Sequence, residues 1–356
     1  MRFSVSPGVR SLSIFPAVSE KELLHKYNLK RLIKMASNEN CYGPSPLAIA
    51  AVKKATLKIN RYPDVYGAVL KEKLAFRQHV SPAQIVLGNG STELIEMIAK
   101  TFLQPNEKCL TAQETFPVYR MAANSINAIC VTVALKKDRY DLQGILDAVD
   151  SNTRLIFIAN PNNPTGTAHG PRDLQDFLSR VPPNVLVVLD EAYREYASGQ
   201  VDVLSPAENL IVLRTFSKVY GLAGLRIGYA VCSPEVASHL NRVSLPYSVN
   251  LIGQIAATAA LEDQEHVTSC VEKNRQQREL VENEFLSRGY HFVPSETNFI
   301  LLNTAQPLSV YEKLLQKGIL VAPVQQYHVP DGIRITFGLP AENQTLLETL
   351  AAISWV

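Results

Sequence analysis

The chain has 356 residues, of which 46% are hydrophobic and 19% are charged, and its formal net charge is +2. This composition is typical of a globular protein, and scattered Lys and Arg residues argue against nucleic acid or a membrane surface as a partner. Five widely spaced cysteines without a CxxC pair, no metal-type histidine spacing and no membrane-length apolar run predict a soluble cytoplasmic protein without a metal.

Three regions are expected along the chain: an N-terminal arm (1–44) packing with the small domain, a large domain (45–250) and a small C-terminal domain (251–356). In the large domain, apolar runs alternate with helical stretches, which is typical of a mostly parallel sheet covered by helices. Strands are expected at residues 84–87, 108–111, 130–134, 155–159, 185–189, 210–213 and 227–231. Helices are expected at residues 93–102, 118–125, 142–147 and 171–179.

The pattern changes after residue 250. Residues 251–288 are predicted to form one or two long helices. Strands at 298–302, 319–321 and 333–336, with helices at 308–317 and 342–353, then predict a smaller α+β domain. The expected fold class is therefore α/β: a large domain with a mostly parallel seven-stranded sheet, joined to a smaller α+β domain.

Polar motifs follow several expected strands of the large domain, at the position where ligands of parallel sheets bind. The first motif is residues 88–93 (GNGSTE), at the start of a helix. Gly90 lets the backbone approach an anion, which the first N–H groups of the helix can bind. A simple helix cap formed by Ser91 or Thr92 with Glu93 is the alternative.

Two further motifs suit a polar ring ligand. Residues 160–166 (NPNNPTG) form a rigid turn whose buried asparagines need partners, and Asn163 suits a phenolic oxygen. Asp190 ends an apolar strand, where a carboxylate needs a cation such as a protonated pyridine nitrogen. Tyr193 could reach the oxygen of the same ring. A helix cap is the alternative for Asp190.

The last motif places Thr215, Ser217, Lys218 and Arg226 shortly after another apolar strand. Two hydroxyls, a lysine and an arginine suit a bound phosphate with a reactive carbonyl beside it. Pyridoxal 5'-phosphate (PLP) carries both of these groups. A basic surface loop is the alternative, but it does not account for the ring-binding motifs.

Together these motifs resemble those of the fold-type I, aspartate-aminotransferase-like PLP enzymes over nearly the whole chain. This resemblance rests on residues 163–166 (NPTG), 190–193 (DEAY), 217–218 (SK) and 226 (R). Within that superfamily the chain is most similar to the histidinol-phosphate aminotransferase family. The closer similarity rests on residues 36–40 (ASNEN), 60–64 (NRYPD), 160–166, 215–218 (TFSK), 223–228 (AGLRIG) and 333–336 (IRIT).

The resemblance implies three catalytic residues. Lys218 would bond covalently to the cofactor aldehyde and later move a proton between the substrate Cα and the cofactor. Asp190 would hold the pyridine nitrogen, while Tyr193 and Asn163 would bond the phenolic oxygen of the ring. The protonated ring then accepts electron density from the substrate, which Asp190 stabilises.

The same resemblance implies further cofactor and substrate contacts. Phe116 would lie against the ring, and Tyr62 would reach the phosphate in the neighbouring subunit, so that the active unit is a homodimer. The phosphate would be held by Gly90, Ser91, Thr92, Thr215, Ser217 and Arg226. An amino donor and a 2-oxo acid would be bound by Phe15, Asn38, Asn163 and Arg334.

Two positions differ from the family pattern on the substrate side. Phe15 stands where a tyrosine is common, and Ala322 stands where a second phosphate-binding arginine is usual. The main hypothesis is therefore histidinol-phosphate:2-oxoglutarate transamination in histidine biosynthesis. The alternatives are an aminotransferase for phenylalanine or tyrosine, whose pocket would be more apolar, and a PLP-dependent decarboxylase resembling threonine-phosphate decarboxylases.

Overall fold

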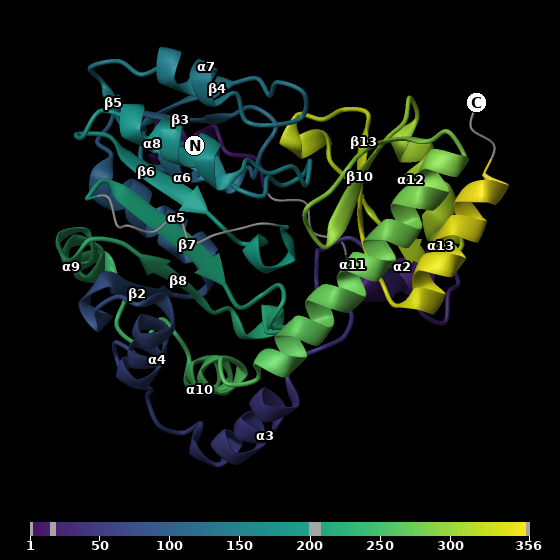
Figure 1. The fold of residues 1–356 in the computed structure, drawn as a ribbon, viewed down its shortest axis with the longest axis horizontal. Coiled ribbons are helices and arrows are strands. Elements are labelled where there is room, and N and C mark those ends of the chain that lie inside the picture. Colours follow the sequence, from purple (N-terminus) through teal and green to yellow (C-terminus); the bar gives the residue numbers. More distant parts are fainter. Residues whose placement is uncertain (1–2, 15–18, 199–207, 354–356) are drawn as a thin grey trace.

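A computed structural model describes residues 3–14, 19–198 and 208–353, which form two lobes of unequal size (Figure 1). The larger lobe surrounds a seven-stranded sheet, and the smaller lobe combines a four-stranded sheet with long helices. This arrangement confirms the expected α/β fold class. Phe15, one of the predicted substrate contacts, lies outside the described residues.

The large sheet is mostly parallel, as its apolar runs predict. Strands β4, β3, β5, β6 and β7 run parallel to one another, whereas β8 runs antiparallel to both of its neighbours. All seven expected strands are present, each within two residues of its expected bounds. In spatial order they are β2 (Ile85–Gly88), β8 (Gly228–Val231), β7 (Leu210–Thr215), β6 (Leu186–Asp190), β5 (Thr153–Ala159), β3 (Lys108–Ala112) and β4 (Ile129–Val133).

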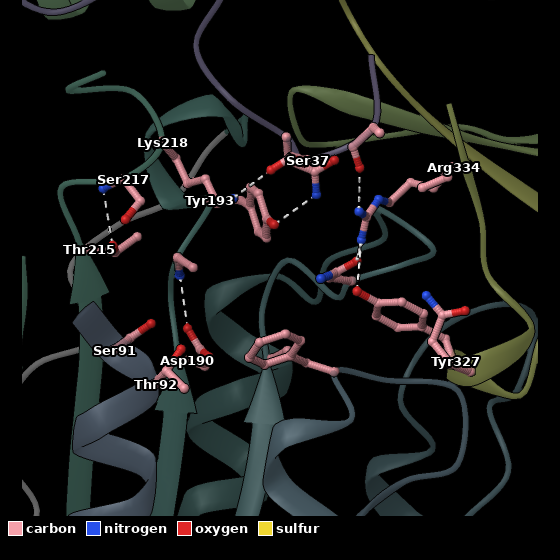
Figure 2. Close-up of a pocket in the computed structure, with 18 of the residues that line it drawn as sticks. Ser37, Ser91, Thr92, Asp190, Tyr193, Thr215, Ser217, Lys218, Tyr327 and Arg334 are labelled. Carbon is pink, nitrogen blue, oxygen red and sulfur yellow. Dashed lines mark hydrogen bonds between the residues drawn. The ribbon is translucent and has the colours of Figure 1, made fainter. Parts of the chain in front are cut away.

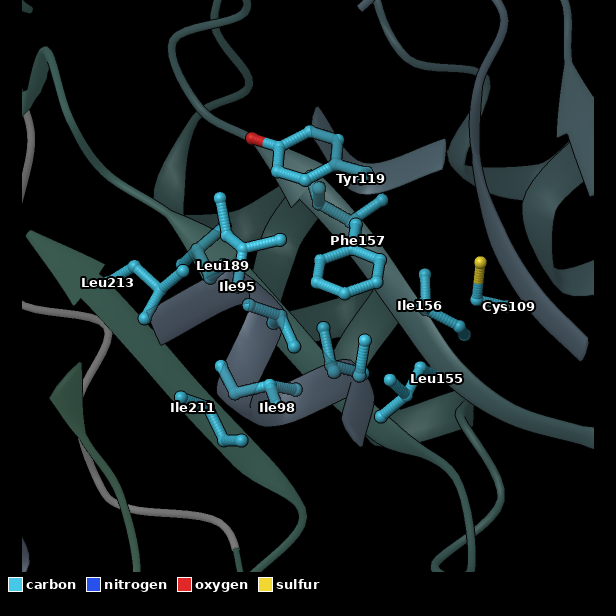
Figure 3. Close-up of a cluster of buried hydrophobic side chains, with 14 of the residues drawn as sticks. Ile95, Ile98, Cys109, Tyr119, Leu155, Ile156, Phe157, Leu189, Ile211 and Leu213 are labelled. Carbon is cyan, nitrogen blue, oxygen red and sulfur yellow. The ribbon is translucent and has the colours of Figure 1, made fainter. Parts of the chain in front are cut away.

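Helices cover both faces of this sheet. Along β2, Ile85 and Leu87 belong to one hydrophobic cluster and Val86 to another, because alternate side chains of a strand point to opposite faces. Figure 3 shows the cluster on the Val86 side, in which Ile95 lies with Phe157. The helices of this lobe are α3 (Pro46–Ala55), α4 (Ala68–Gln78), α5 (Gly90–Phe102), α6 (Val118–Ser125), α7 (Leu142–Asp147), α8 (Pro171–Arg180), α9 (Pro234–Val243) and α10 (Leu251–Ala260).

Helix α5 is held with its first turn at the carboxyl edge of the sheet. Leu94, Ile95 and Ile98 recur at helical spacing and are fully buried, and each such side chain contributes about 1.5–3 kcal/mol through burial. Glu93 Oε2 accepts a hydrogen bond from the Asn89 backbone N–H at 2.6 Å. This contact occupies a backbone donor just before the helix, so the first helical N–H groups remain for a ligand.

A buried ion pair joins the ends of β6 and β7. Arg214 Nε and Nη2 each lie 2.8 Å from Glu191 Oε2, and both side chains are almost fully buried. Asp190 directly precedes Glu191, and Thr215 directly follows Arg214, so the pair fixes two strand ends that carry predicted cofactor contacts.

Replacing Glu191 with glutamine should lower the free energy of unfolding by about 3 kcal/mol, because the buried Arg214 guanidinium loses a carboxylate that contacts it through two nitrogens. Chemical denaturation of the cofactor-free protein measures this change. The matched control is Glu272→Gln, since Glu272 pairs with Arg275 through two nitrogens on an exposed face of α11 (Gln264–Ser287). The control should leave the stability unchanged. Equal losses in the two variants would contradict a special role for the buried pair.

The smaller lobe is an antiparallel sheet flanked by helices. Its strand order is β12 (Ala322–Pro323), β13 (Gly332–Thr336), β10 (Phe299–Asn303) and β9 (His291–Val293), and β9 was not expected from the sequence. The long helix α11 runs from the large lobe to this lobe, with α12 (Pro307–Gln316) and α13 (Pro340–Ala352) alongside its far part (Figure 1).

The predicted domain boundary at residue 251 assigns α10 to the small domain. Helix α10 packs against α3 and α4, and its Ala256, Ala257 and Ala260 share a hydrophobic cluster with Leu70 and Leu74 of α4. The lobes therefore diverge along α11. The alanine-rich sequence indicates a helix, but small apolar side chains do not reveal which surface that helix packs against.

The N-terminal arm contacts both lobes, although it was expected to pack with the small one. Strand β1 (Ile33–Lys34) pairs in parallel with β11 (Ile319–Leu320) of the small lobe. The helix α1 (Pro7–Arg10) instead contacts α6, and Asn127 Oδ1 accepts from the Gly8 N–H at 2.8 Å. After β1, the arm passes between the lobes at residues 36–38, which places its backbone beside the cavity described next.

Candidate active site

A cavity of about 590 Å³ lies between the lobes, where β5, β6 and β7 end (Figure 2). Its walls come from these strand ends, the first turn of α5, the arm, and the small-lobe strands β12 and β13. The cavity brings together most of the predicted site residues: Asn38, Ser91, Thr92, Phe116, Asn163, Asp190, Tyr193, Thr215, Ser217, Lys218, Arg226 and Arg334.

Asp190 is the buried carboxylate of the site. Burial raises its pKa to about 6. Tyr119 Oη donates to Asp190 Oδ2 at 2.7 Å, and the Ala192 N–H donates to Oδ1 at 3.1 Å. Both bonds favour the ionised form, so they counteract burial. A buried carboxylate of this kind is suited to pair with a cationic ring nitrogen.

Lys218 is the candidate nucleophile and base. Its Nζ lies 5.3 Å from the centre of the Tyr193 ring and donates to the Ser37 carbonyl oxygen at 3.3 Å. Burial, assisted by the positive charge of Arg334, lowers the pKa of Lys218 to about 8. A useful fraction of its amine is therefore neutral near physiological pH, as attack on a carbonyl and proton abstraction require.

An anion-binding cradle forms where α5 begins beside Arg226. Arg226 Nη1 donates to Ser217 Oγ at 3.3 Å, and Thr215 Oγ1 accepts from the Ser217 N–H at 3.1 Å. Gly90 has φ +80°, and a Cβ there would come within 2.5 Å of Arg226 Nη2. Glycine thus allows the guanidinium to approach the helix N-terminus, where Ser91 lines the cavity.

Arg334 provides a second positive charge on the small-lobe side of the cavity. It is 6% exposed, and its Nη1 donates to Asn163 Oδ1 at 2.6 Å and to Tyr327 Oη at 3.1 Å, while Nη2 donates to the Ala36 carbonyl at 2.7 Å. These partners are neutral, and Nε is buried without a hydrogen-bond partner. Among the described residues no carboxylate pairs with this guanidinium, so it is suited to bind an anionic ligand.

These groups fit PLP group by group. The carboxylate of Asp190 suits the ring nitrogen, the cradle suits the phosphate, and Lys218 suits the aldehyde. Tyr193 Oη and the amide nitrogen of Asn163 can both donate to the phenolic oxygen, because Asn163 Oδ1 is engaged by Arg334. Phe116 lines the same cavity and offers a ring face for stacking.

Tyr62 lies outside the cavity formed by its own chain. Its side chain is 80% exposed and stacks on Tyr247, with ring centres 4.5 Å apart. Ala322 does line the cavity, and it is the cross-strand neighbour of Arg334. No second arginine therefore stands at that position beside Arg334.

Sequence reasoning missed several contributors to the cavity. Tyr119 was assigned only to a helix, although it lies three residues after Phe116, on the first turn of α6, and bonds Asp190. The arm residues Ala36 and Ser37 act through backbone carbonyls, which no side-chain motif reveals. Tyr311 of α12 also lines the cavity, and no sequence signal distinguishes it from an ordinary surface tyrosine.

Three further findings concern metal ions, membranes and cysteines. Within the described residues, no group of three or more His, Cys, Asp or Glu side chains is placed to hold a metal ion. No helix in the same part of the chain has the length and apolar character needed to cross a membrane. All five cysteines are free thiols.

Comparisons with known proteins agree with the geometry. The sequence model of the family "Aminotransferase class I and II" matches residues 30–350. Histidinol-phosphate aminotransferase 2 of Pseudomonas fluorescens (strain Pf0-1) is 43% identical, with 98% of this chain and 96% of the relative aligned. Histidinol-phosphate aminotransferase 2 of Pasteurella multocida is 42% identical, with 97% of each chain aligned.

A solved structure extends the similarity to the fold. The histidinol-phosphate aminotransferase of Sinorhizobium meliloti, crystallised with pyridoxal 5'-phosphate, superposes with a TM-score of 0.89 at 30% sequence identity. The alignment covers 99% of this chain and 98% of that protein. The sequence match, the superposition and the assembled site lead to one assignment: the chain belongs to the class I and II aminotransferases, a family of PLP-dependent transaminases.

Proposed function

We propose that this enzyme transfers the amino group of histidinol phosphate to 2-oxoglutarate, in histidine biosynthesis. The observation that carries the proposal is Arg334, a buried guanidinium on the side of the cavity away from the cradle, with no acidic partner among the residues that the structure describes. Both substrates carry an anionic group that one planar guanidinium can bind through two hydrogen bonds. The names of the two aligned relatives support the same substrate.

The residues of the chain divide the work of transamination. Bound PLP supplies an electron sink for the negative charge that develops at the substrate Cα. Lys218, with its lowered pKa, would take the Cα proton once its amine is free. Asp190 would keep the ring nitrogen protonated. Arg334 would hold the anionic group of the substrate, so that the Cα–H bond faces Lys218.

Neutral side chains surround the anion anchor. Gln325, Gln326, Tyr311 and Tyr327 line the cavity, and they offer hydrogen bonds near the position of Ala322. We infer that they take part in holding a phosphate monoester in place of a second arginine, and that Phe15 and Asn163 complete the side-chain contacts to the substrate. Both ends of the Asn38 amide are engaged within the protein, so this residue would border the substrate without a direct side-chain hydrogen bond to it. Neutral donors bind phosphate more weakly than a guanidinium does.

A second candidate is transamination of phenylalanine or tyrosine. The cavity wall from Leu320 to Pro323 contains Val321 and Ala322 and is apolar, which favours an uncharged aromatic side chain. Phenylalanine and tyrosine have no anionic group on the side chain. Arg334 would then bind the α-carboxylate of the amino acid or have no anion to bind. Under this candidate, removing a guanidinium that binds the α-carboxylate should slow the reaction with phenylalanine, whereas under the first candidate it should slow the reaction with histidinol phosphate.

Substituting Arg334 with glutamine tests the choice of substrate. The apparent second-order rate constant of the single-turnover reaction with histidinol phosphate should fall about 100-fold to 1000-fold. The reason is that a charge-assisted bidentate contact is lost in a buried site. Stopped-flow absorbance of the bound cofactor, with histidinol phosphate, phenylalanine and glutamate in turn, measures these rates. Leu320→Ala, at an apolar position that lines the same cavity, is the control for a local cavity change.

Wild-type enzyme that reacts with phenylalanine but leaves its cofactor spectrum unchanged with histidinol phosphate would favour the second candidate. Carbon dioxide release without amino transfer would favour a decarboxylase instead.

We further propose a cytoplasmic homodimer in which Tyr62 reaches the phosphate of the partner subunit. Unpaired thiols are typical of a reducing compartment. Large exposed side chains gather on the segments around α3 and α4 and near residue 247, and a second copy of the chain is a natural cover for them. They include Leu47, Ile49, Leu57, Ile59, Tyr62, Val65, Tyr66, Val69, Phe76, Leu245 and Tyr247. A monomer by analytical ultracentrifugation would contradict the proposal.

A further inference from the structure

Asn38 lies in the arm, between the two lobes, and both ends of its side-chain amide are engaged. It is 1% exposed and has φ +55°, a backbone conformation that asparagine tolerates better than most residues. Its Nδ2 lies 2.8 Å from Tyr193 Oη, and its Oδ1 lies 3.1 Å from Thr336 Oγ1. Asn38 thus connects Thr336, on the small-lobe strand β13, to Tyr193 of the large lobe. Figure 2 shows Tyr193 beside Lys218.

The backbone determines the direction of these hydrogen bonds. The Asn38 N–H donates to Thr336 Oγ1 at 2.9 Å, so the threonine oxygen accepts there and its own proton is available for Asn38 Oδ1. With Oδ1 facing this donor, the amide nitrogen faces Tyr193 and donates to it. Tyr193 Oη therefore accepts from the arm, and its single O–H proton is left to point into the cavity.

We infer that Thr336 and Asn38 are positioning residues that make Tyr193 a hydrogen-bond donor toward the phenolic oxygen of the cofactor. The inference rests on the proposed cofactor but not on the identity of the substrate. It gives Asn38 a role that acts through Tyr193, whereas the resemblance to known enzymes implied direct substrate contact for this residue.

The arrangement also ties the substrate anchor to the cofactor. Thr336 and Arg334 are two residues apart on β13, so their side chains leave the same face of the sheet. Arg334 Nη2 donates to the Ala36 carbonyl, and Asn298 Nδ2 donates to the Asn38 carbonyl at 3.0 Å. The small lobe therefore holds the arm on both sides of Ser37, and hydrogen bonds through Asn38 link β13 to Tyr193.

The pH dependence of the visible absorbance of the holoenzyme, without substrate, tests the inference. A donor to the phenolic oxygen stabilises its anionic form, so losing the donor should raise the midpoint of the colour change. Thr336→Val, Asn38→Asp and Tyr193→Phe should each raise it by about one pH unit, the size expected for one hydrogen bond to a charged oxygen. Thr336→Ser, which keeps the hydroxyl, should retain the wild-type midpoint.

Other charged and titratable groups face Tyr193, and they are unchanged in these variants. They are Arg334 on β13, Asp190 on β6, Tyr119 on α6, Tyr196 after β6, and Lys218 after β7. Asn38→Asp also adds a charge near the cofactor. The double variant Asn38→Asp/Tyr193→Phe measures the shift caused by that charge alone, because the tyrosine hydroxyl is absent. The double variant Thr336→Val/Tyr193→Phe makes the same comparison without an added charge. With Phe at position 193, Thr336→Val should cause no further shift, because it acts through the tyrosine hydroxyl.

Three outcomes would overturn the inference: a wild-type midpoint in both Thr336→Val and Asn38→Asp, equal shifts in Thr336→Val and Thr336→Ser, or additive shifts in the double variants. If Thr336→Val does not fold, Asn38→Asp with its double variant carries the test. A wild-type holoenzyme that shows no visible absorbance would instead refute the proposed cofactor.

Discussion

Replacing Lys218 with alanine should abolish covalent attachment of the cofactor and lower the rate of amino transfer by at least about 10⁴-fold. The loss combines the nucleophile that holds the aldehyde with the base that moves the Cα proton, and each role alone is worth orders of magnitude. Cofactor binding without a covalent bond should persist, because the cradle, Asp190 and Asn163 remain. Borohydride reduction followed by mass spectrometry detects the attachment, and coupled assays detect the transfer.

A second lysine provides the control for this variant. Burial also lowers the pKa of Lys71, on α4, which does not line the cavity. Lys71→Ala should therefore keep both attachment and activity, apart from any loss of stability. A reducible covalent adduct in the Lys218→Ala protein would show that another amine holds the aldehyde, and the assignment of Lys218 would be wrong.

Replacing Asp190 with asparagine should lower the turnover rate by about 10²-fold to 10³-fold, the range measured when one preorganised electrostatic contact to a developing charge is removed. The neutral amide no longer keeps the ring nitrogen protonated, so the ring accepts less charge from the substrate. Steady-state kinetics and cofactor affinity of the cofactor-free protein, both as functions of pH, measure the change. Asp141→Asn, which alters the N-cap of α7 away from the cavity, is the control.

The sign of the pH effect follows from the raised pKa of Asp190. In the wild-type cofactor-free protein, the carboxylate takes up a proton as the pH falls through about 6, so its contribution to cofactor affinity is lost at lower pH. In Asp190→Asn this contribution is missing at every pH. Since a raised folded-state pKa means that ionised Asp190 destabilises the fold above about pH 6, the variant without cofactor should be no less stable at pH 7. A variant as active as wild type would refute the assigned role.

Much of the large lobe could be predicted from its sequence because parallel strands covered on both faces appear as uninterrupted apolar runs. Residues 155–159 and 210–213 show this pattern, and every residue in both runs is buried. The short strand His291–Val293 gave no such signal, because it has only one fully buried residue. The helices that α10 packs against could not be predicted either, because a helix face of small alanine side chains can pack against many surfaces.

The cofactor half of the site was predictable because its residues follow strand ends in recognisable motifs, and parallel strand ends meet at one edge of a sheet. The contacts around Asn38 were not predictable in detail. They join residues nearly 300 positions apart, such as Asn38 and Thr336 (|i−j| = 298), and depend on which way an amide points. Tyr119 was missed for a similar reason, because its bond to Asp190 requires the fold to be known.

The most direct test of the proposed function is the product balance of a complete reaction. Purified holoenzyme incubated with histidinol phosphate and 2-oxoglutarate should form glutamate in a one-to-one ratio with the histidinol phosphate consumed, and should release no carbon dioxide. Quantitative NMR of the glutamate formed and the histidinol phosphate remaining measures this ratio. Failure to form glutamate from histidinol phosphate, while phenylalanine yields it under the same conditions, would contradict the proposed function.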